Sequence, residues 1–270
     1  MSYNLYDWNN ALRQRDEYVE DRLKDGSPIV AIAFDEGILL VTVRSAQRKL
    51  FEVYDRLIMG ALGKQSDIES LRLAAIDTAH REGFERSPDD VSIQRLVGFS
   101  LSPAVKRVYN DQQAIPLTVR AIFGELGKTP ETDHLFVLGY DGEFRAQSHA
   151  AVAAGTPYAE EQAEESLRSA QPTTLPQALA AALNAWGIGR SQLSPKSKSR
   201  DEDDEYKLDN GDGTVSDAPT VSDDPNVAIR EALKDGAVLE AALLQRNTTR
   251  ESKFRLLTAA ETEEALTTFR

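Results

Sequence analysis

Ser27 is the residue of this 270-residue chain whose type and position first suggest chemistry. It follows Gly26 and opens the stretch SPIVAIAFDEGILLVTV, in which two apolar runs flank Asp35-Glu36-Gly37. A serine hydroxyl is a weak nucleophile at neutral pH unless a neighbouring base takes its proton. A cut between Gly26 and Ser27 would free the α-amine of Ser27 to act as that base. Without the cut, Ser27 is a residue at the entry of a strand.

The other residue types that could do chemistry lack a supporting pattern. The DNGDG stretch at 209–213 alternates carboxylates, but Gly211 and Thr220 occupy positions where a calcium loop needs oxygen ligands. The histidines lie in different predicted elements without paired spacing: His80, His134 and His149. There is no cysteine, no G-x-x-x-x-G-K-[ST] phosphate loop and no G-x-S-x-G elbow. We therefore expect no metal and no cofactor.

The charge of the chain narrows the choice of partners. The formal net charge is −13, which disfavours a nucleic-acid partner because phosphates would be repelled. No apolar run reaches the roughly 18 residues that a membrane span requires, and the first residues lack the apolar core of a signal peptide. We expect a cytoplasmic protein that binds neither nucleic acid nor a membrane.

One segment carries much of this charge. Residues 197–224 hold ten acidic and three basic residues and few large apolar ones. Such a composition does not bury enough surface to offset the entropy of ordering. We expect a disordered acidic insertion near 190–230, lying within a single domain because the segments after it resemble strands that need a sheet to join.

The elements around Ser27 begin with strands. The two apolar runs predict a hairpin covered on both faces, and a second strand pair follows at LFEVY and LIMGAL. Ser66 and Glu69 then predict a capping box for a helix that ends at Gly83. Ser87-Pro88 predicts the start of another helix, which continues to Val108.

Strands return in the second half of the chain. They are predicted at LTVRAIFGEL, HLFVLGY and EFRAQSHAAV, with a hairpin turn at Asp141-Gly142 between the last two. Two alanine-rich helices, two further strands and a terminal helix capped by Thr258 complete the order. Separate runs of strands and helices indicate an α+β protein. Strands that are apolar on both faces need two covers, which predicts two stacked antiparallel sheets between helix layers, a four-layer αββα sandwich.

Residues 10–25 form a predicted helix with only a narrow apolar seam at Leu12, Val19 and Leu23. Such a helix is poorly held unless it also lies against something outside its own core. We divide the chain into an N-terminal segment and helix, 1–25, and a domain, 26–270.

The order and spacing of these pieces resemble the α-type ring subunits of bacterial proteasome core particles, members of the Ntn-hydrolase superfamily. RDEYVEDRLKDGSPIVAIAFDEGILLV is similar to the α-subunit helix that runs through a Gly-[Ser/Thr] pair into the first strand. KLFEVYDRLIMGALG and SDIESLRLAAIDTAHREGF continue the likeness, as does LEAALLQRNTTRESKFRLLTAAETEEAL near the end. The resemblance covers nearly all of the chain except 190–230. It implies the Ntn-hydrolase sandwich fold.

The resemblance also implies a site that is only half preserved. Ser27 falls at the position of the catalytic threonine of β-type subunits, but its nitrogen stays in the Gly26–Ser27 peptide. Val43 falls where those subunits carry their catalytic acid, whereas Lys49 and Gly63 match the active-site lysine and the oxyanion-hole glycine. In α-type subunits these last two positions belong to a pocket that receives activator tails. Lys49, Gly63 and Glu17 are then the expected docking residues, with no catalytic residue.

The function implied is that of a non-catalytic ring subunit that gates a proteolytic chamber. Its partners would be further copies of itself in a ring of seven, β-type subunits, and a ring-shaped ATPase activator that docks through its C-terminal tails. The aromatic residues of a mobile segment, 1–13, would form the gate: Tyr3, Tyr6 and Trp8. Two alternatives stay open, a self-processing amidohydrolase that uses Ser27 and a stand-alone ring scaffold.

Overall fold

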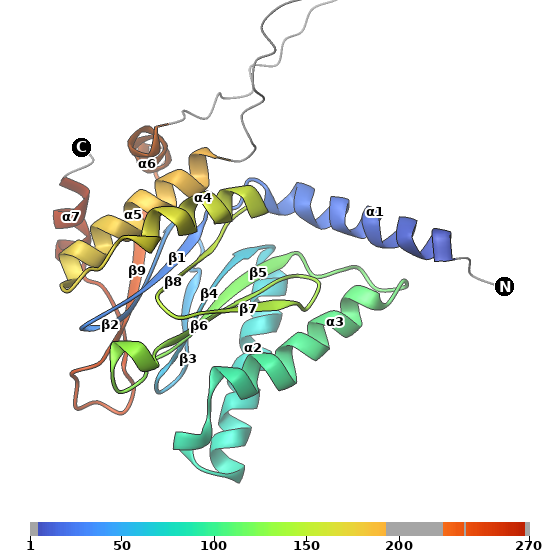
Figure 1. Cartoon of the computed structure of the whole chain (residues 1–270), viewed down its shortest axis with the longest axis horizontal. Coiled ribbons are helices and arrows are strands. Elements are labelled where there is room, and N and C mark those ends of the chain that lie inside the picture. Colours follow the sequence, from blue (N-terminus) through green and yellow to red (C-terminus); the bar gives the residue numbers. More distant parts are fainter. Residues whose placement is uncertain (1–4, 193–223, 235, 268–270) are drawn as a thin grey trace, which may run out of the picture.

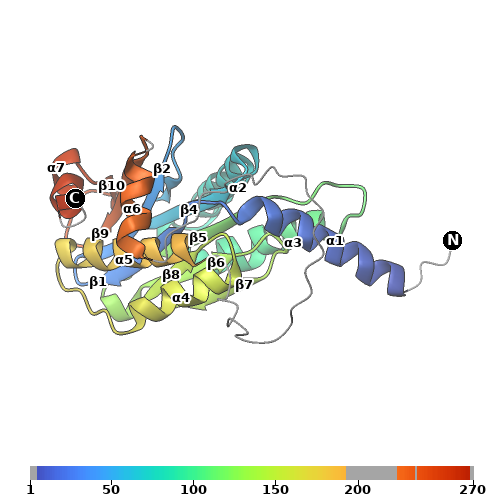
Figure 2. The ribbon, with the colours of Figure 1, turned by 90° about the horizontal axis from the view of Figure 1, so that it is seen from above.

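A computed structural model describes residues 5–192, 224–234 and 236–267. Within them, two five-stranded antiparallel sheets are stacked face to face between layers of helices (Figure 1). This confirms the α+β sandwich predicted from the sequence. The view from above shows α1 extending from one end of the molecule and α7 lying at the other (Figure 2).

The first sheet contains the strands that flank Ser27. Its order is β10-β9-β2-β1-β8, with bounds Phe254–Leu256, Val238–Gln245, Gly37–Arg44, Ile29–Phe34 and Ala150–Ala153. The predicted β1–β2 hairpin is confirmed, with Phe34 opposite Gly37. Gly37 has a φ of +149°, and a Cβ there would lie 1.8 Å from the carbonyl oxygen of Leu244 on β9. The turn needs glycine because β9 passes so close.

The second sheet follows the chain order, β3-β4-β5-β6-β7. Its strands are Leu50–Tyr54, Leu57–Gly63, Val119–Glu125, His134–Leu138 and Phe144–Gln147. The sequence predicted one strand over EFRAQSHAAV, and this is wrong: β7 ends at Gln147 in the second sheet and β8 starts at Ala150 in the first. The chain crosses between the sheets at Ser148 and His149, whose ring nitrogen Nε2 lies 2.6 Å from the carbonyl oxygen of Ala170.

Three apolar layers hold the sandwich together. Alternate residues of β1 and β2 face opposite ways, so Val30 and Val41 meet the outer helices whereas Ile29 and Leu40 meet the second sheet. The outer helices of the first sheet are α4 (Pro157–Arg168), α5 (Leu175–Ser191), α6 (Pro225–Lys234) and α7 (Ala259–Leu266). The second sheet is covered by α2 (Gln65–Glu85), η2 (Gln94–Leu101) and α3 (Ser102–Asn110). Strands apolar on both faces are thereby buried on both faces.

The start and end of α2 differ from the prediction. The N-cap is Lys64 and makes no side-chain cap, and Ser66 instead hydrogen-bonds Asp67. Asp67 accepts a hydrogen bond from the backbone nitrogen of Thr118 at 2.9 Å, which ties the helix start to β5. Gly83 does not end the helix. A Cβ there would lie 2.3 Å from the hydroxyl of Tyr54, so this glycine serves the packing of α2 on β3.

Other element boundaries also differ from the prediction. The helix expected from Ser87 is a short 3₁₀ turn, η1 (Pro88–Asp90), followed by the π-helix η2 and only then α3. Glu125 of β5 accepts the backbone N–H of Ile93 at 2.8 Å and holds the chain between η1 and η2. A further 3₁₀ turn, η3, spans Pro130–Thr132. Because α5 reaches Ser191 and α6 begins at Pro225, residues at both ends of the predicted insertion are helical; 193–223 lie outside the described residues.

The N-terminal helix α1 spans Leu5–Leu23, so residues 5–13, expected to be mobile, are helical. Val19 and Leu23 are fully buried at the end of the layer between the sheets. Asp16 accepts a hydrogen bond from the Tyr109 hydroxyl at 2.6 Å, and burial together with this carboxylate raises the pKa of Tyr109. The second half of α1 is thus part of the domain, whereas its first half projects beyond the sheets (Figure 1).

Candidate functional site

Ser27 lies two residues before β1, and its hydroxyl is fully used by the fold. Its Oγ donates to the carbonyl oxygen of Val43 and accepts the indole N–H of Trp186 at 3.2 Å. Thr42 stands beside it, 3.4 Å from Oγ, and donates to the carbonyl oxygen of Pro28 at 2.7 Å. Trp186 is buried in α5. Ser27 therefore joins the end of β2 to the helix layer.

Lys49 lies just before β3, and its side chain reaches Ser27. Its Nζ donates to the carbonyl oxygen of Ser27 at 3.5 Å. Its backbone carbonyl accepts the N–H of Ala61 at 3.0 Å, which fixes it beside β4. Burial lowers the pKa of Lys49 to about 8; the charge of Arg190 acts in the same direction and that of Glu240 opposes it. The ammonium is therefore held in a partly dehydrated place.

Glu240 is a residue of this site that the sequence analysis missed. It lies on β9 opposite Thr42, and one carboxylate oxygen accepts the backbone N–H of Lys49 at 3.0 Å. The same oxygen lies 3.3 Å from Nε of Arg44. Burial raises the pKa of Glu240, while the Lys49 N–H and Arg44 act in the opposite direction. One signal was available: Glu240 is the single charged residue in the otherwise apolar run AVLEAALL.

Val43 does not face this cluster. It packs with Val41 and Leu39 against the outer helices, whereas Thr42 and Glu240 lie opposite each other on the adjoining strands. The position that the family pattern assigns to a catalytic acid therefore carries an apolar side chain within the helix-facing layer. No carboxylate from this position reaches Ser27.

Gly63 has a structural reason to be glycine. Its φ is +127°, and a Cβ would lie 2.1 Å from the carbonyl oxygen of Thr118 on the neighbouring chain segment. A ligand could not approach Gly63 along the Cβ direction, because that space is filled by Thr118. Gly63 shapes the end of β4, two residues beyond the Ala61 that binds Lys49.

One known protein family has a sequence model that matches this chain. A sequence model of the family described as "Proteasome subunit" matches residues 23–189, which include Ser27, Val43, Lys49 and Gly63. The chain belongs to the proteasome subunit family. Glu240 lies outside the matched residues.

Individual relatives carry the name "Proteasome subunit alpha". The protein of Xylanimonas cellulosilytica is 30% identical over 53% of this chain and 59% of its own length. That of Actinosynnema mirum is 32% identical over 53% of this chain and 55% of its own, and that of Kineococcus radiotolerans 28% over 65% and 74%. In the first two comparisons the chain spans little more than half the length of the relative.

The remaining predicted site residues of this proteasome family member lie on α1 or before it. Glu17 is exposed on α1, and among the described residues its side chain makes no hydrogen bond or ion pair. Trp8 is half-buried on the projecting part of the helix, and Tyr6 belongs to the same helix. Tyr3 lies outside the described residues. None of the contacts in the described part of the chain joins these residues to Lys49.

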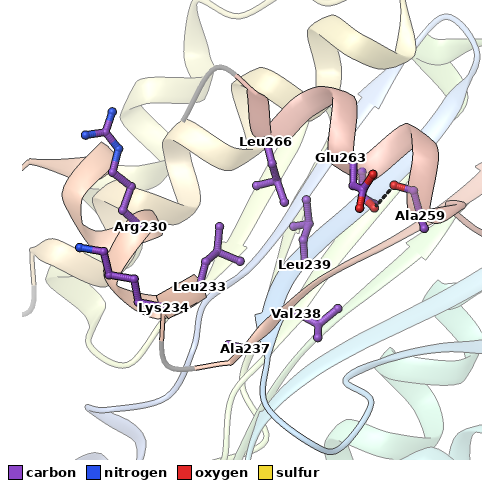
Figure 3. A pocket seen from close by; sticks show the side chains of 10 residues that line it. Arg230, Leu233, Lys234, Ala237, Val238, Leu239, Ala259, Glu263 and Leu266 are labelled. Atoms are coloured by element: carbon purple, nitrogen blue, oxygen red, sulfur yellow. Dashed lines mark hydrogen bonds between the residues drawn. The ribbon is translucent and has the colours of Figure 1, made fainter. Parts of the chain in front are cut away.

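No group of His, Asp and Glu in the described residues could hold a metal ion, and the DNGDG stretch lies outside them. The described helices also include none that is long and apolar enough to cross a bilayer. An open groove of 620 Å³ lies between α6, β9 and α7 (Figure 3). Its floor is apolar, with Leu233, Leu239 and Leu266, and it lies on the helix-facing side of the sheet, opposite Glu240. This groove is therefore separate from the Lys49 cluster.

Proposed function

We propose that this chain is a non-catalytic α-type ring subunit of a proteasome core particle. It forms the outer ring, controls the entry of substrates to the proteolytic chamber and docks an ATPase activator. Membership of the proteasome subunit family and the α-subunit names of the relatives support this assignment. The observation that carries it is that the Ser27 hydroxyl is engaged by Val43 and Trp186.

Ser27 lacks two requirements of an N-terminal nucleophile, a free α-amine and the catalytic acid that Val43 replaces. Its nitrogen is bound in a peptide, and the helix before it is anchored by the buried Val19 and Leu23. Its hydroxyl is engaged by Val43 and Trp186. A hydroxyl attacks efficiently only when a base is placed to take its proton. The engaged hydroxyl and the apolar Val43 oppose the alternative of a self-processing amidohydrolase.

Lys49 is the residue of the docking pocket. The charge of Arg190 acts on the Lys49 ammonium, and Arg44 contacts Glu240, so the positive charges in this cluster outnumber the single negative charge of Glu240. A partly dehydrated cation binds a carboxylate more strongly than an exposed one because less water has to be displaced. The terminal carboxylate of an activator tail fits this chemistry, with Gly63 shaping the neighbouring backbone and Glu17 contacting the gate.

The ring is formed by further copies of this chain, seven in number by family resemblance. A groove of 560 Å³ runs between α1 and the loop after α3, lined by Arg15, Tyr18, Gln112, Ile115 and Pro116. Ile115 is 74% exposed and Tyr18 lies beside it in the groove. An exposed apolar surface of this kind is typical of a subunit contact. The first residues, with Tyr3, Tyr6 and Trp8, form the gate.

The second partner is a β-type subunit. Three large apolar side chains on the outer helices α2 and η2 are exposed: Leu73, Phe84 and Phe99. Phe84 is 93% exposed, which is unfavourable in a monomer and favours burial against another chain. A stand-alone ring scaffold, the remaining alternative, would have no use for this second surface. We place the complete particle in the cytoplasm.

The test uses the assembled particle with its β-type subunits. A synthetic peptide with the C-terminal sequence of the ATPase is titrated while hydrolysis of a small peptide is followed. Lys49→Ala should weaken tail binding by about one to two powers of ten, the loss expected for one charge-assisted contact. The matched control is Lys64→Ala, an exposed lysine at the N-cap of α2.

The docking function would be wrong if Lys49→Ala bound the tail as the wild type does. A variant that bound the tail normally but lost basal hydrolysis with intact β-type subunits would point to a catalytic role for Lys49.

A further inference from the structure

Glu240 connects the far end of the sequence to Lys49. It lies on β9, 191 residues after Lys49, and its side chain is only 5% exposed. One oxygen binds the Lys49 backbone N–H and faces Arg44, while the other, Oε1, is buried and makes no hydrogen bond with the described residues. A buried carboxylate with one unsatisfied oxygen is unfavourable. Its presence between apolar neighbours on β9 calls for a role beyond packing.

The charged groups near Lys49 and Glu240 come from β9, β2, α5 and the loop before β3. Glu240 of β9 supplies the negative charge, and Arg44 at the end of β2 binds it. The positive charge of Arg48, the residue before Lys49, also acts on Glu240. Arg190 of α5 donates to the carbonyl oxygen of Asp25 at 3.0 Å, and its charge acts on Lys49. Glu240 is thus the carboxylate whose charge opposes that of Arg190 at Lys49.

We infer that Glu240 is a positioning residue of the Lys49 site: it fixes the Lys49 backbone at the start of β3 and keeps the Lys49 ammonium charged for a ligand carboxylate. The second part rests on the proposed docking function. The first part is visible in the hydrogen bond to the Lys49 N–H, which fixes where the side chain begins. The carboxylate that the family places in its active site from β2 is absent at Val43, and Glu240 supplies one to this region from β9 instead.

The effect of this charge on Lys49 has a definite direction. Burial already lowers the pKa of Lys49 to about 8, so its protonated fraction changes within the neutral range. Glu240 opposes that loss because an opposite charge favours the protonated ammonium. Removing the charge alone should lower the pKa of Lys49 further below about 8. A larger fraction of Lys49 would then be neutral at pH 7.5, and its attraction for a carboxylate would be weaker.

Glu240→Gln separates charge from position, because the amide oxygen still accepts the Lys49 N–H. The intact wild type and the variant are treated with a limiting amount of acetic anhydride between pH 6 and 10, and acetylation of Lys49 is quantified by peptide mass spectrometry. Only the neutral amine reacts, so the midpoint reports the charge of Lys49 directly. Lys64 is the internal reference within each sample, and Glu161→Gln, at an exposed glutamate of α4, is the matched control.

We expect a midpoint near 8 in the wild type and in Glu161→Gln, and a lower midpoint in Glu240→Gln. A tail peptide with a free carboxylate should bind Glu240→Gln more weakly than the wild type at pH 7.5 and equally well at pH 6, in proportion to the charged fraction. The same peptide with a C-terminal amide should show no such dependence. Replacing Lys49 by Arg in the Glu240→Gln chain should restore binding at pH 7.5, since a guanidinium stays charged.

An unchanged labelling midpoint in Glu240→Gln would overturn the inference whatever the tail does. A lowered midpoint in chains that bind no tail peptide at any pH would support the coupling of Glu240 to Lys49 and would contradict the docking function instead. A second result would also overturn the assignment of Glu240 to the ligand site. In it, labelling shows that Lys49 is neutral in Glu240→Gln, but Lys49→Arg in the same chain does not restore binding.

Discussion

The indole nitrogen of Trp186 donates a hydrogen bond to the hydroxyl oxygen of Ser27 over 3.2 Å, and this bond links α5 to the entry of β1. Each partner helps to fix the position of the other within the fold. Ser27→Ala leaves the buried indole N–H unpaired, so the free energy of unfolding should fall by about 1 to 2 kcal/mol. Denaturant unfolding followed by tryptophan fluorescence measures this.

Trp186→Phe provides the control, because it removes the donor itself. The double variant with Ser27→Ala should be less destabilised than the sum of the single changes. A sum that is strictly additive would mean that the two residues do not interact in solution.

The buried ion pair between Arg120 and Glu160 should be sensitive to the loss of one partner. Arg120 of β5 lies 2.9 Å from Glu160 of α4, and both side chains are 8% exposed. Arg120 also donates to the carbonyl oxygen of Ala154 at 2.7 Å, so it joins the second sheet to the helix layer beyond the first. Arg120→Met should lower the free energy of unfolding by about 3 to 5 kcal/mol, because it removes the buried partner of Glu160 and leaves only the half-exposed Arg145 beside it.

Replacing both residues by methionine should recover much of that loss, since no charge is then left alone. Arg145 contacts the other oxygen of Glu160 at 2.8 Å but is half exposed, so Arg145→Met is the milder comparison. Equal losses for Arg120→Met and Arg145→Met would contradict the special position of Arg120.

Acid should weaken the last helix through Glu261. This residue completes the capping box with Thr258 and binds Arg255 at 2.9 Å; the bond to Arg255 lowers the pKa of Glu261 from 4.5 to about 2. A carboxyl whose pKa is lower in the folded state stabilises the fold above pH 4.5 and loses that contribution as the pH falls from 4.5 to 2. Because the side chain is 31% exposed, we expect a contribution of about 1 kcal/mol.

Glu261→Gln should remove this contribution at pH 7 and flatten the stability curve between pH 4.5 and 2. To test this, the midpoint of denaturant unfolding is measured at each pH for the variant and for the wild type. A variant with the same acid slope as the wild type would show that other carboxyls control the loss.

The sequence predicted the sandwich because its strongest signals are local. Two-sided apolar strands at 29–34 and 38–43 and the Asp141-Gly142 turn were enough to require two covered sheets. The separation of β7 from β8 was not visible, since the chain changes sheet at Ser148 and His149 without a glycine or proline. The replacement of the Ser66 cap by the Asp67–Thr118 contact likewise depends on β5, which lies 51 residues away.

The candidate site was predicted only in part. Lys49 and Ser27 were found through a family pattern of fixed spacing, and the structure brings them together. Glu240 was missed because a lone glutamate in a strand has no sequence partner. The close approach of Thr118 to Gly63 was also hidden, because the reason for a glycine lies in a neighbouring segment.

Substitutions in the two proposed subunit surfaces should affect different steps of assembly. Ile115→Asp places a charge in the groove beside α1 and should reduce ring formation by this chain at least about tenfold in concentration, the effect of losing one central interface residue. Phe84→Asp should leave the ring intact and weaken the binding of β-type subunits by a similar factor. Size-exclusion chromatography with light scattering reports both. Deleting residues 1–25 would not test either surface, because Val19 and Leu23 belong to the core.

An identical defect in both variants would mean that the surfaces are not distinct. Lys234→Asp, at the open groove between α6 and α7, serves as the control and should assemble normally.

The most direct measurement is native mass spectrometry of this chain co-produced with the β-type subunit of the same genome, combined with a peptidase assay. The expected result is a ring of full-length chains that retain Gly26 and Ser27 in peptide linkage, stacked on β-type subunits, with hydrolysis only when those subunits are present. A chain that begins at Ser27 and hydrolyses peptides without any β-type subunit would contradict the assignment of a non-catalytic ring subunit.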